Sequence, residues 1–235
     1  PGIFVFDAPG FTPNAGTYTA DVQFVPADTA SYTMVSGTVQ VIVAQATPAV
    51  YSWPTAAAIA FGQTLGQAAL SGGDASLPGT FAFANPTVAP AVGVSLEAVI
   101  FTPTDAVNYE IVIGSASVTV NKATPTIIDW PVANLIVYGQ PISEAKLGGG
   151  VASTPGTFTF DTPATILPAG EHDVAVTFTP SNTEGYNTVS GTVSLLVDQA
   201  TPVVNAWPMA SAITVGDALS VSVLSGGGAS TPGVF

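Results

Sequence analysis

The chain has 235 residues, of which 47% are hydrophobic and only 7% are charged, and its 24 Gly and 20 Pro exclude an all-helical fold because both residues interrupt helices. Two Lys against 15 Asp plus Glu give a formal net charge of −13, so we expect no nucleic-acid partner, because the chain would repel phosphates. Every apolar run is shorter than the roughly 18 residues that a membrane helix needs, so we expect no membrane insertion, and the absence of Cys excludes disulfide bonds and thiol nucleophiles.

A four-residue pattern, Pro-Gly-x-Phe, recurs with a constant spacing. It begins every 77 residues, at Pro1, Pro78, Pro155 and Pro232. Other residues keep the same spacing without insertion or deletion: Phe24, Phe101 and Phe178; Tyr32, Tyr109 and Tyr186; Trp53, Trp130 and Trp207. A period of this length exceeds the roughly 20–50 residues of a solenoid unit and suits a small β domain that folds by itself.

Alternating apolar and polar residues predict short strands with one buried face. In chain order these strands contain Val22 and Phe24; Val39, Val41 and Val43; Ile59 to Phe61; Phe81 to Phe83; Val118 and Val120; Thr126 to Trp130; Val174, Val176 and Phe178; and Val193, Leu195 and Val197. Between them we expect turns at the three Trp-Pro pairs and at Gly148 to Gly150. Six or seven short strands per period predict an antiparallel β-sandwich.

Each period also has a tyrosine six residues after the proline of a Phe-x-Pro motif. These residues are Tyr32, Tyr109 and Tyr186. We expect each to form a tyrosine corner, in which the hydroxyl group ties the loop to nearby backbone.

Several motifs together resemble bacterial Ig-like domain repeats of secreted and cell-surface proteins. They are Ala-Thr-Pro at Ala46, Ala123 and Ala200; Tyr138-Gly139-Gln140; Pro155 to Phe158; Leu167 to Gly170; and Phe-Thr-Pro followed by Asn-Tyr or Gly-Tyr. The resemblance covers the whole chain. It implies an all-β fold of tandem Ig-like antiparallel β-sandwiches in a linear array, an extracellular or cell-surface location, and no catalytic residues.

The motifs predict four domain segments. They are residues 1–45, the C-terminal part of a repeat; 46–122 and 123–199, two whole repeats; and 200–235, the N-terminal part of a repeat. Proline at Pro48, Pro125 and Pro202 fixes φ and predicts short, stiff junctions.

The two outer segments carry complementary halves of one core. One half holds Phe4, Phe6, Val22, Phe24 and Val39, and the other holds Ile213, Val215, Leu219 and Phe235. Three interpretations stay open: the chain is a window on a longer tandem protein, copies complement one another by strand addition into a head-to-tail fibre, or three whole domains begin at Pro-Gly-x-Phe.

Two groups of polar residues are candidates for chemistry. His172 is the only histidine, and Tyr18 and Ser95 occupy its positions in the other repeats, so we expect a surface residue and no enzyme. Asp28, Asp105 and Asn182 share one repeat position, and Asn108 and Glu110 lie near the second of them. These oxygen atoms suit either calcium or the capping of a turn, and we predict the cap, with no metal or cofactor.

Three further features have a structural and a functional interpretation. Gly148 to Gly150 lacks the lysine and helix of a phosphate loop, so we expect a hairpin or a mobile surface loop. The Trp-Pro tryptophans suit domain-end packing better than sugar stacking. Val88 to Val94 is the most divergent and apolar segment, and we do not expect it to be a binding site.

Two functions remain. The first is a non-catalytic structural repeat segment of an extracellular stalk, fibre or adhesin shaft, with neighbouring copies or adjacent repeats as partners. The second is a glycan- or protein-binding surface module, which predicts that one repeat differs sharply from the others.

Overall fold

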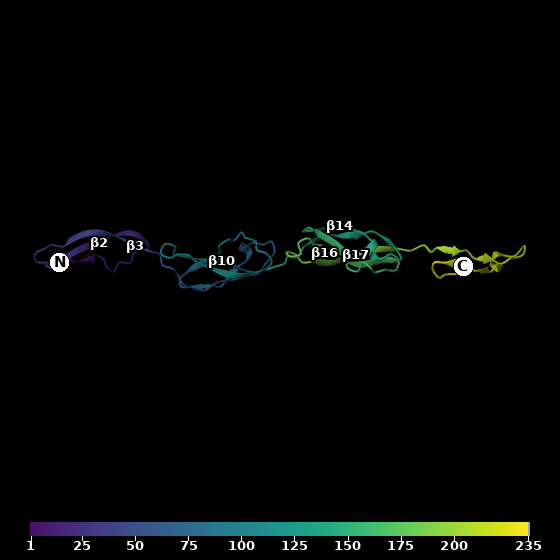
Figure 1. The fold of residues 1–235 in the computed structure, drawn as a ribbon, viewed down its shortest axis with the longest axis horizontal. Coiled ribbons are helices and arrows are strands. Elements are labelled where there is room, and N and C mark those ends of the chain that lie inside the picture. Colours follow the sequence, from purple (N-terminus) through teal and green to yellow (C-terminus); the bar gives the residue numbers. More distant parts are fainter. Residues whose placement is uncertain (235) are drawn as a thin grey trace. The chain divides into compact units, whose positions relative to one another are not determined.

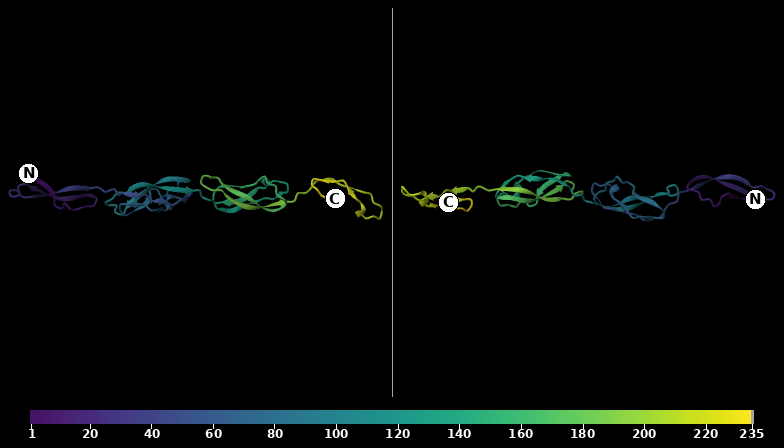
Figure 2. Two further views of the ribbon diagram at one scale, coloured as in Figure 1. Left: turned by 90° about the horizontal axis from the view of Figure 1, so that it is seen from below. Right: turned by 180° about the vertical axis from the view of Figure 1, so that it is seen from behind.

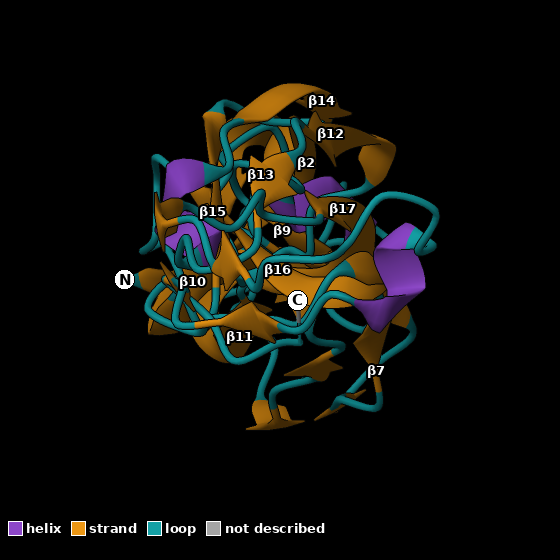
Figure 3. Ribbon diagram, turned by 90° about the vertical axis from the view of Figure 1, so that its right-hand side faces the viewer, coloured by secondary structure: helices purple, strands orange, loops and turns teal. Residues whose placement is uncertain are grey.

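The computed structural model describes residues 1–234. Within these residues the chain forms β-strands and three single-turn 3₁₀ helices, and no α-helix (Figure 3). The prediction of an all-β fold is confirmed. The chain divides into two compact units, one of Pro1–Ala123 with Glu184–Tyr186, the other of Thr124–Thr183 with Asn187–Phe235.

The first unit begins with a three-stranded antiparallel sheet. Its strands are β1 (Gly2–Phe6), β2 (Gly16–Pro26) and β3 (Val35–Val43), in the order β1-β2-β3 (Figure 1). Phe4 pairs with Phe24 and Val22 pairs with Gly37, so the alternating apolar side chains of all three strands share one face. Figure 2 shows this sheet, in purple, as a single layer.

The rest of the first unit is a two-layer sandwich. One layer has the order β6-β11-β10-β9, with β6 (Ile59–Ala60), β11 (Val112–Asn121), β10 (Gly93–Pro103) and β9 (Gly79–Phe83). The other layer contains β4 (Val50–Ser52) paired with β8 (Asp74–Ala75), β5 (Thr55–Ala56) paired with β7 (Leu70–Ser71), and the 3₁₀ helix η1 (Leu65–Gln67). The pairing within this layer is antiparallel except at one edge, where β6 runs parallel to β11.

The core of this sandwich is formed by both layers. Leu65 and Ala68 come from the segment that covers the sheet, and the β6-β11-β10-β9 sheet contributes Ile59, Phe83, Val99, Ala116, Val118 and Val120. Trp53 packs against the same core, edge-on to Phe81 at a centroid distance of 5.7 Å. The buried residues alternate along β10 and β11, which is why the sequence pattern predicted these strands.

The second unit repeats this arrangement. Its larger sheet has the order β13-β17-β16-β15, with β13 (Ile136–Val137), β17 (Val189–Asp198), β16 (Gly170–Pro180) and β15 (Gly156–Phe160), and β13 again runs parallel to β17. The facing layer is β12 (Ile127–Ala133) paired with β14 (Leu147–Ala152). The 3₁₀ helix η2 (Ile142–Glu144) lies between these two strands in the sequence. The core includes Ile136, Ile142, Val176, Leu195 and Val197.

Two sequence expectations are corrected here. Trp130 and Pro131 do not form a turn but lie inside β12, and Gly148 to Gly150 is neither a hairpin tip nor a loop but part of β14. Proline is tolerated in β12 because β12 has a partner on one side only, so its missing N–H breaks no second ladder.

The last part of the second unit forms two small hairpin-like pairs. β18 (Val204–Ala206) pairs with β21 (Gly228–Ala229), and β19 (Met209–Ala210) pairs with β20 (Leu224–Ser225), with η3 (Leu219–Val221) between them in sequence. Leu219 is exposed there, whereas its counterpart Leu65 is buried. Phe235, assigned above to the same half core, lies outside the described residues.

Candidate interaction surfaces

His172 lies on β16 and is half-buried. Its Nε2 atom is 2.8 Å from the backbone oxygen of Pro168, so the ring holds the preceding loop. The hydroxyl group of Ser194 donates to Glu171 at 2.7 Å, and not to the imidazole. The structure therefore brings together no Ser-His-carboxylate relay at the single histidine.

Asp105 caps its own loop. Its Oδ1 atom accepts hydrogen bonds from the backbone N–H groups of Val107 and Asn108, at 3.2 and 3.1 Å, and its Oδ2 atom accepts one from Asn108 Nδ2 at 2.8 Å. These bonds, the Asn108 side chain first among them, hold the pKa of Asp105 below its usual range. Asp28 accepts from Ala30 and Ser31 in the same way.

These contacts favour the turn-cap interpretation of the shared acidic position over calcium. The oxygen atoms that would bind a cation already accept N–H donors, and Glu110 accepts the hydroxyl group of Thr47 at 3.0 Å. Among residues 1–234 no group of three or more His, Asp or Glu side chains is placed to hold a metal ion.

Asn108 joins three pieces of the first unit. Its Nδ2 atom donates to Asn14 Oδ1 at 3.1 Å, and its Oδ1 atom accepts the N–H of Ala15 at 2.8 Å. Its backbone oxygen accepts the N–H of Ala46 at 2.8 Å. Through its side chain and its backbone oxygen Asn108 thus connects the turn before β2, the linker after β3 and the Asp105 loop, and we call this set of contacts the Asn108 clasp.

Gln45 closes the clasp from the linker. Its Nε2 atom donates to the backbone oxygens of Ala106 and Val107, at 2.8 and 3.1 Å. The linker is therefore held by side-chain and backbone bonds together, which restricts its conformations far more than the nearby proline alone.

The segment Glu184–Tyr186 makes the equivalent contacts in an aromatic form. The N–H of Ala123 donates to the oxygen of Gly185 at 2.9 Å, and the ring of Tyr186 lies edge-on to Phe61 at 5.3 Å. A Cβ atom on Gly185 would stand 2.4 Å from the Phe61 ring, so this position accepts glycine where the preceding repeat has Asn108.

The three repeat tyrosines do not form the predicted tyrosine corners, and two of them contact the linkers through their backbone. Among residues 1–234 the hydroxyl groups of Tyr32, Tyr109 and Tyr186 form none of the hydrogen bonds seen in the structure. Tyr109 and Tyr186 instead act through their backbone, in parallel bridges to Ala46 and Ala123. Tyr32 is exposed.

The sheet of β1, β2 and β3 leaves its apolar face uncovered. Phe4, which pairs with Phe24, is 77% exposed. A Cβ atom on Gly37 would meet nothing within 4 Å, whereas Trp53 and Trp130 cover the corresponding glycines, Gly114 and Gly191. The first sheet thus has the composition of a sandwich layer without its second layer.

One strand of the sandwich in the first unit carries an unusual outer row. Val94 and Leu96 on β10 point away from the core and are 71% and 76% exposed. Their equivalents on β16 are Glu171 and Asp173, which suit an exposed position. We call Val94, Leu96, Ala98 and Ile100 the aliphatic row.

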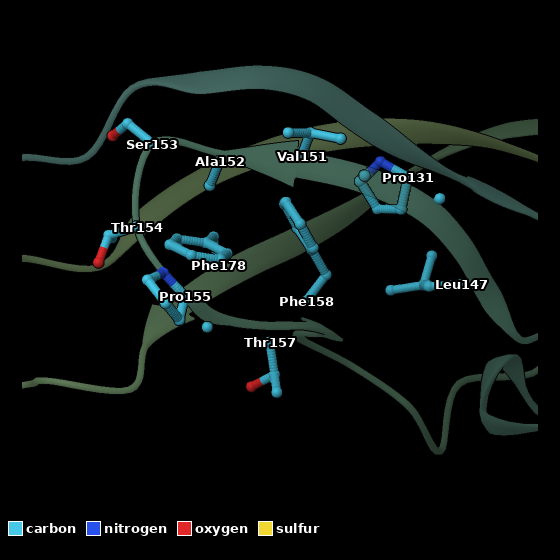
Figure 4. A pocket seen from close by; sticks show the side chains of 13 residues that line it. Pro131, Leu147, Val151, Ala152, Ser153, Thr154, Pro155, Thr157, Phe158 and Phe178 are labelled. Atoms are coloured by element: carbon cyan, nitrogen blue, oxygen red, sulfur yellow. The ribbon is translucent and has the colours of Figure 1, made fainter.

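A cleft of about 630 Å³ opens beside β14 and β15. Figure 4 shows Phe158 and Phe178 on its floor and Pro131 and Leu147 at one end. None of its lining residues is charged or a histidine, so the cleft offers no general acid or base.

Comparison with known proteins gives structural neighbours only. No family model matches the chain, and no curated protein matches it. Immunoglobulin domains 1–5 of Sidekick-1 superpose with a TM-score of 0.32 and 11% identity, covering 81% of this chain and 48% of that one, so the chain spans about half of that fragment.

Two other neighbours are also tandem β domains. The I67–I69 fragment of titin has a TM-score of 0.30 and 15% identity and covers 70% of each chain. Drosophila N-cadherin EC1-3 has a TM-score of 0.25 and 11% identity, covering 83% of this chain and 80% of that one. With scores this low, the fold description rests on the strand order given above.

The sequence did not lead us to the Asn108 clasp or the aliphatic row. The row had a signal, since Val94 and Leu96 stand where another repeat has two acids. The clasp had no such signal in the sequence, because Asn14 and Asn108 lie far apart in the chain.

No helix within residues 1–234 has the length and apolarity to cross a bilayer.

Proposed function

We propose that the chain is a non-catalytic structural repeat segment of an extracellular stalk, fibre or adhesin shaft, assembled with adjacent repeats or with neighbouring copies head to tail by strand complementation. The observation that carries the proposal is that the buried core recurs residue by residue between residues 46–122 and 123–199. Val99 and Val176 are fully buried at equivalent positions, as are Val118 and Leu195, whereas His172 has no counterpart of its kind.

The Asn108 clasp supports the same role. A stalk has to transmit tension from one repeat to the next, and a linker whose Gln45 and Thr47 side chains form hydrogen bonds with the following repeat resists bending better than a free one. The extracellular location rests on the resemblance of the motifs to bacterial Ig-like repeats.

Mechanical unfolding of the full chain tests this function. Pulling from the two ends should unfold residues 46–122 and 123–199 as two separate steps, each releasing on the order of 250 Å of chain. Val99→Ala should lower the force of one step only, because that side chain is fully buried in one core. A single gradual extension without steps would contradict the proposal.

Location is tested separately on the producing cells. An antibody against residues 46–199 should label intact cells. Labelling that appears only after the cells are permeabilised would contradict a surface role.

The aliphatic row favours a second candidate, a glycan- or protein-binding module. Exposed apolar rows that one repeat carries and another replaces with acids are typical of contact surfaces. A photo-cross-linking residue at Thr119, which pairs with Val94, should capture a partner on intact cells if the row binds a protein.

The matched control for this second candidate is the double variant Val94→Glu, Leu96→Asp, which introduces the residues of the other repeat. It should keep the fold and abolish the cross-link. Binding of the full chain to a glycan array that survives this change would place a glycan site elsewhere.

A further inference from the structure

The outer face of the sheet formed by β9, β10 and β11 carries the aliphatic row and no charge. Along β10 the outward side chains of the row alternate with the buried Val99 and Phe101. The outward side chains of the flanking strands are also uncharged, and they include Ile113, Ser115, Ser117, Thr119, Thr80 and Ala82. The face is therefore apolar along its centre, with small or hydroxyl-bearing side chains along most of its sides.

This uncharged outer face is specific to residues 46–122, a repeat in which both layers of the sandwich are present. The equivalent face of residues 123–199 carries Glu171 and Asp173 on β16. On β2 the equivalent face carries Asp21, which stands where Ala98 stands on β10. Of the three sheets with three or more strands in residues 1–234, only the sheet of β10 has an outer face without an acid.

We propose that this face binds the same face of a second copy of the chain, so that two copies lie side by side through residues 46–122. The inference deepens the binding-module candidate of the proposed function and identifies its partner as a second copy. Two chains that each carry a net charge of −13 repel one another, so their closest contact has to use surfaces without charge. The aliphatic row is such a surface, and its burial removes apolar area from water.

The order of side-chain sizes along β10 suits a two-fold contact. About an axis that passes between Leu96 and Ala98, the two β10 strands run antiparallel and Leu96 of each copy faces Ala98 of the other. Val94 then faces Ile100. A parallel arrangement would set Leu96 against Leu96 and Ala98 against Ala98, which leaves a gap over the alanines that a closely packed interface does not tolerate. The antiparallel arrangement is therefore the one we propose.

The neighbouring strand fits the same alignment. On β11, Thr119 pairs with Val94 and Ile113 pairs with Ile100. The same axis therefore places Ile113 of one copy opposite Thr119 of the other. No charged side chain of β9, β10 or β11 is on this face, so the contact buries no unpaired charge.

The size of the face predicts a weak and reversible contact. The row extends about 25 Å along β10, and three strands at about 4.8 Å each add about 14 Å, so two copies bury about 700 Å². Stable interfaces bury roughly 1,200 Å² or more. The pair should therefore form only at high concentration, which copies held on one surface reach locally.

Cysteine cross-linking of the full chain tests the inference and its register. The chain has no cysteine, so an introduced thiol is the only one in each variant. An equimolar mixture of Thr119→Cys and Ile113→Cys chains should cross-link with a short bismaleimide, because the two positions face each other. Either variant alone should give much less product, since its two thiols lie about 20 Å apart along the strands.

The matched control uses the acidic face of the other complete repeat. Ser190 and Leu196 are the equivalents of Ile113 and Thr119, and they pair with Thr177 and Glu171 on β16. A mixture of Ser190→Cys and Leu196→Cys chains should give no such product. Equal cross-linking at the two faces would overturn the inference, because it would show association that does not depend on the aliphatic row.

Two further measurements separate this contact from other kinds of association. Adding Val94→Glu and Leu96→Asp to both cysteine chains should abolish the product while leaving the midpoint of unfolding unchanged, because both side chains are exposed. Raising the salt concentration should increase the yield, because salt screens the repulsion between two acidic chains.

The outcomes that overturn the inference differ from those that overturn the structural role. No product from the mixture of Thr119→Cys and Ile113→Cys, as much product from either variant alone, or product that survives Val94→Glu, Leu96→Asp would overturn it. Capture of only a different protein by the photo-cross-linker at Thr119 on intact cells would also overturn it, while supporting the protein-binding candidate. Stepwise unfolding of residues 46–122 and 123–199 tests the structural role independently of any pairing.

Discussion

The indole ring of Trp130 lies against Gly191, and a Cβ atom added to that glycine would stand 2.3 Å from the ring. Trp53 lies against Gly114 in the same way. Both tryptophans are thus packing residues that close one side of their sandwich. The strand that faces each of them needs a glycine at the contact, because any side chain there would collide with the indole ring.

Gly191→Ala should destabilise its sandwich by about 1–3 kcal/mol, because the new methyl group must displace the Trp130 ring. Chemical denaturation monitored by tryptophan fluorescence measures this change. Gly37→Ala is the control in a monomeric chain, since its Cβ meets nothing within 4 Å, and equal effects at both positions would contradict the packing role.

Gly185→Ala should break the contact between Phe61 and Tyr186. The added Cβ would collide with the Phe61 ring, and losing an edge-on aromatic pair costs about 0.5–1.5 kcal/mol. Faster hydrogen exchange at the Ala123 amide, which donates to Gly185, reports the loss. Phe61→Val in the same chain, the residue type of Val215 at that repeat position, removes the ring that the new methyl group meets without restoring the aromatic pair, so exchange at Ala123 should be slower than in Gly185→Ala and faster than in the wild type.

Trypsin should cut the chain into very few fragments. Lys122 and Lys146 are its only basic residues, so complete digestion yields residues 1–122, 123–146 and 147–235. Mass spectrometry of a limited digest checks this, and a ladder of small tryptic peptides would contradict it.

The strands that face the core were predictable because their side chains alternate. Val174, Val176 and Phe178 point inward from β16 in the order that the sequence shows. The parallel strand β6 was not predictable, because it has two residues and its pairing with β11 depends on a partner about 60 positions away.

Two local signals misled the prediction for a physical reason. Pro131 lies on a strand that needs no donor there, and Gly149 and Gly150 take φ values of 71° and 79° within β14. Glycine and proline indicate irregular backbone, but here Pro131 pairs with Gly149 in regular register, so the residues belong to a paired strand and not to a turn. At the candidate calcium position the structure shows the predicted turn caps at Asp28 and Asp105, whereas the clasp that Asn108 adds depends on contacts between distant segments.

The final prediction concerns the pH dependence of the Asn108 clasp. The pKa of Asp105 is lowered, first by the Asn108 side-chain bond and then by backbone bonds, so its contribution to the loop is present above the ordinary aspartate value of about 4 and is lost as the pH falls through the lowered folded value. NMR titration of the Asp105 carboxyl group should show that Asn108→Ala moves its pKa back toward the ordinary value, while Asp105→Asn, the residue type at position 182, removes the titration from the loop. Hydrogen exchange at the Ala15 amide, which Asn108 accepts, should quicken at acidic pH relative to the Asp105→Asn chain. An Asp105 pKa that stays the same in Asn108→Ala would show that the clasp does not hold the carboxylate.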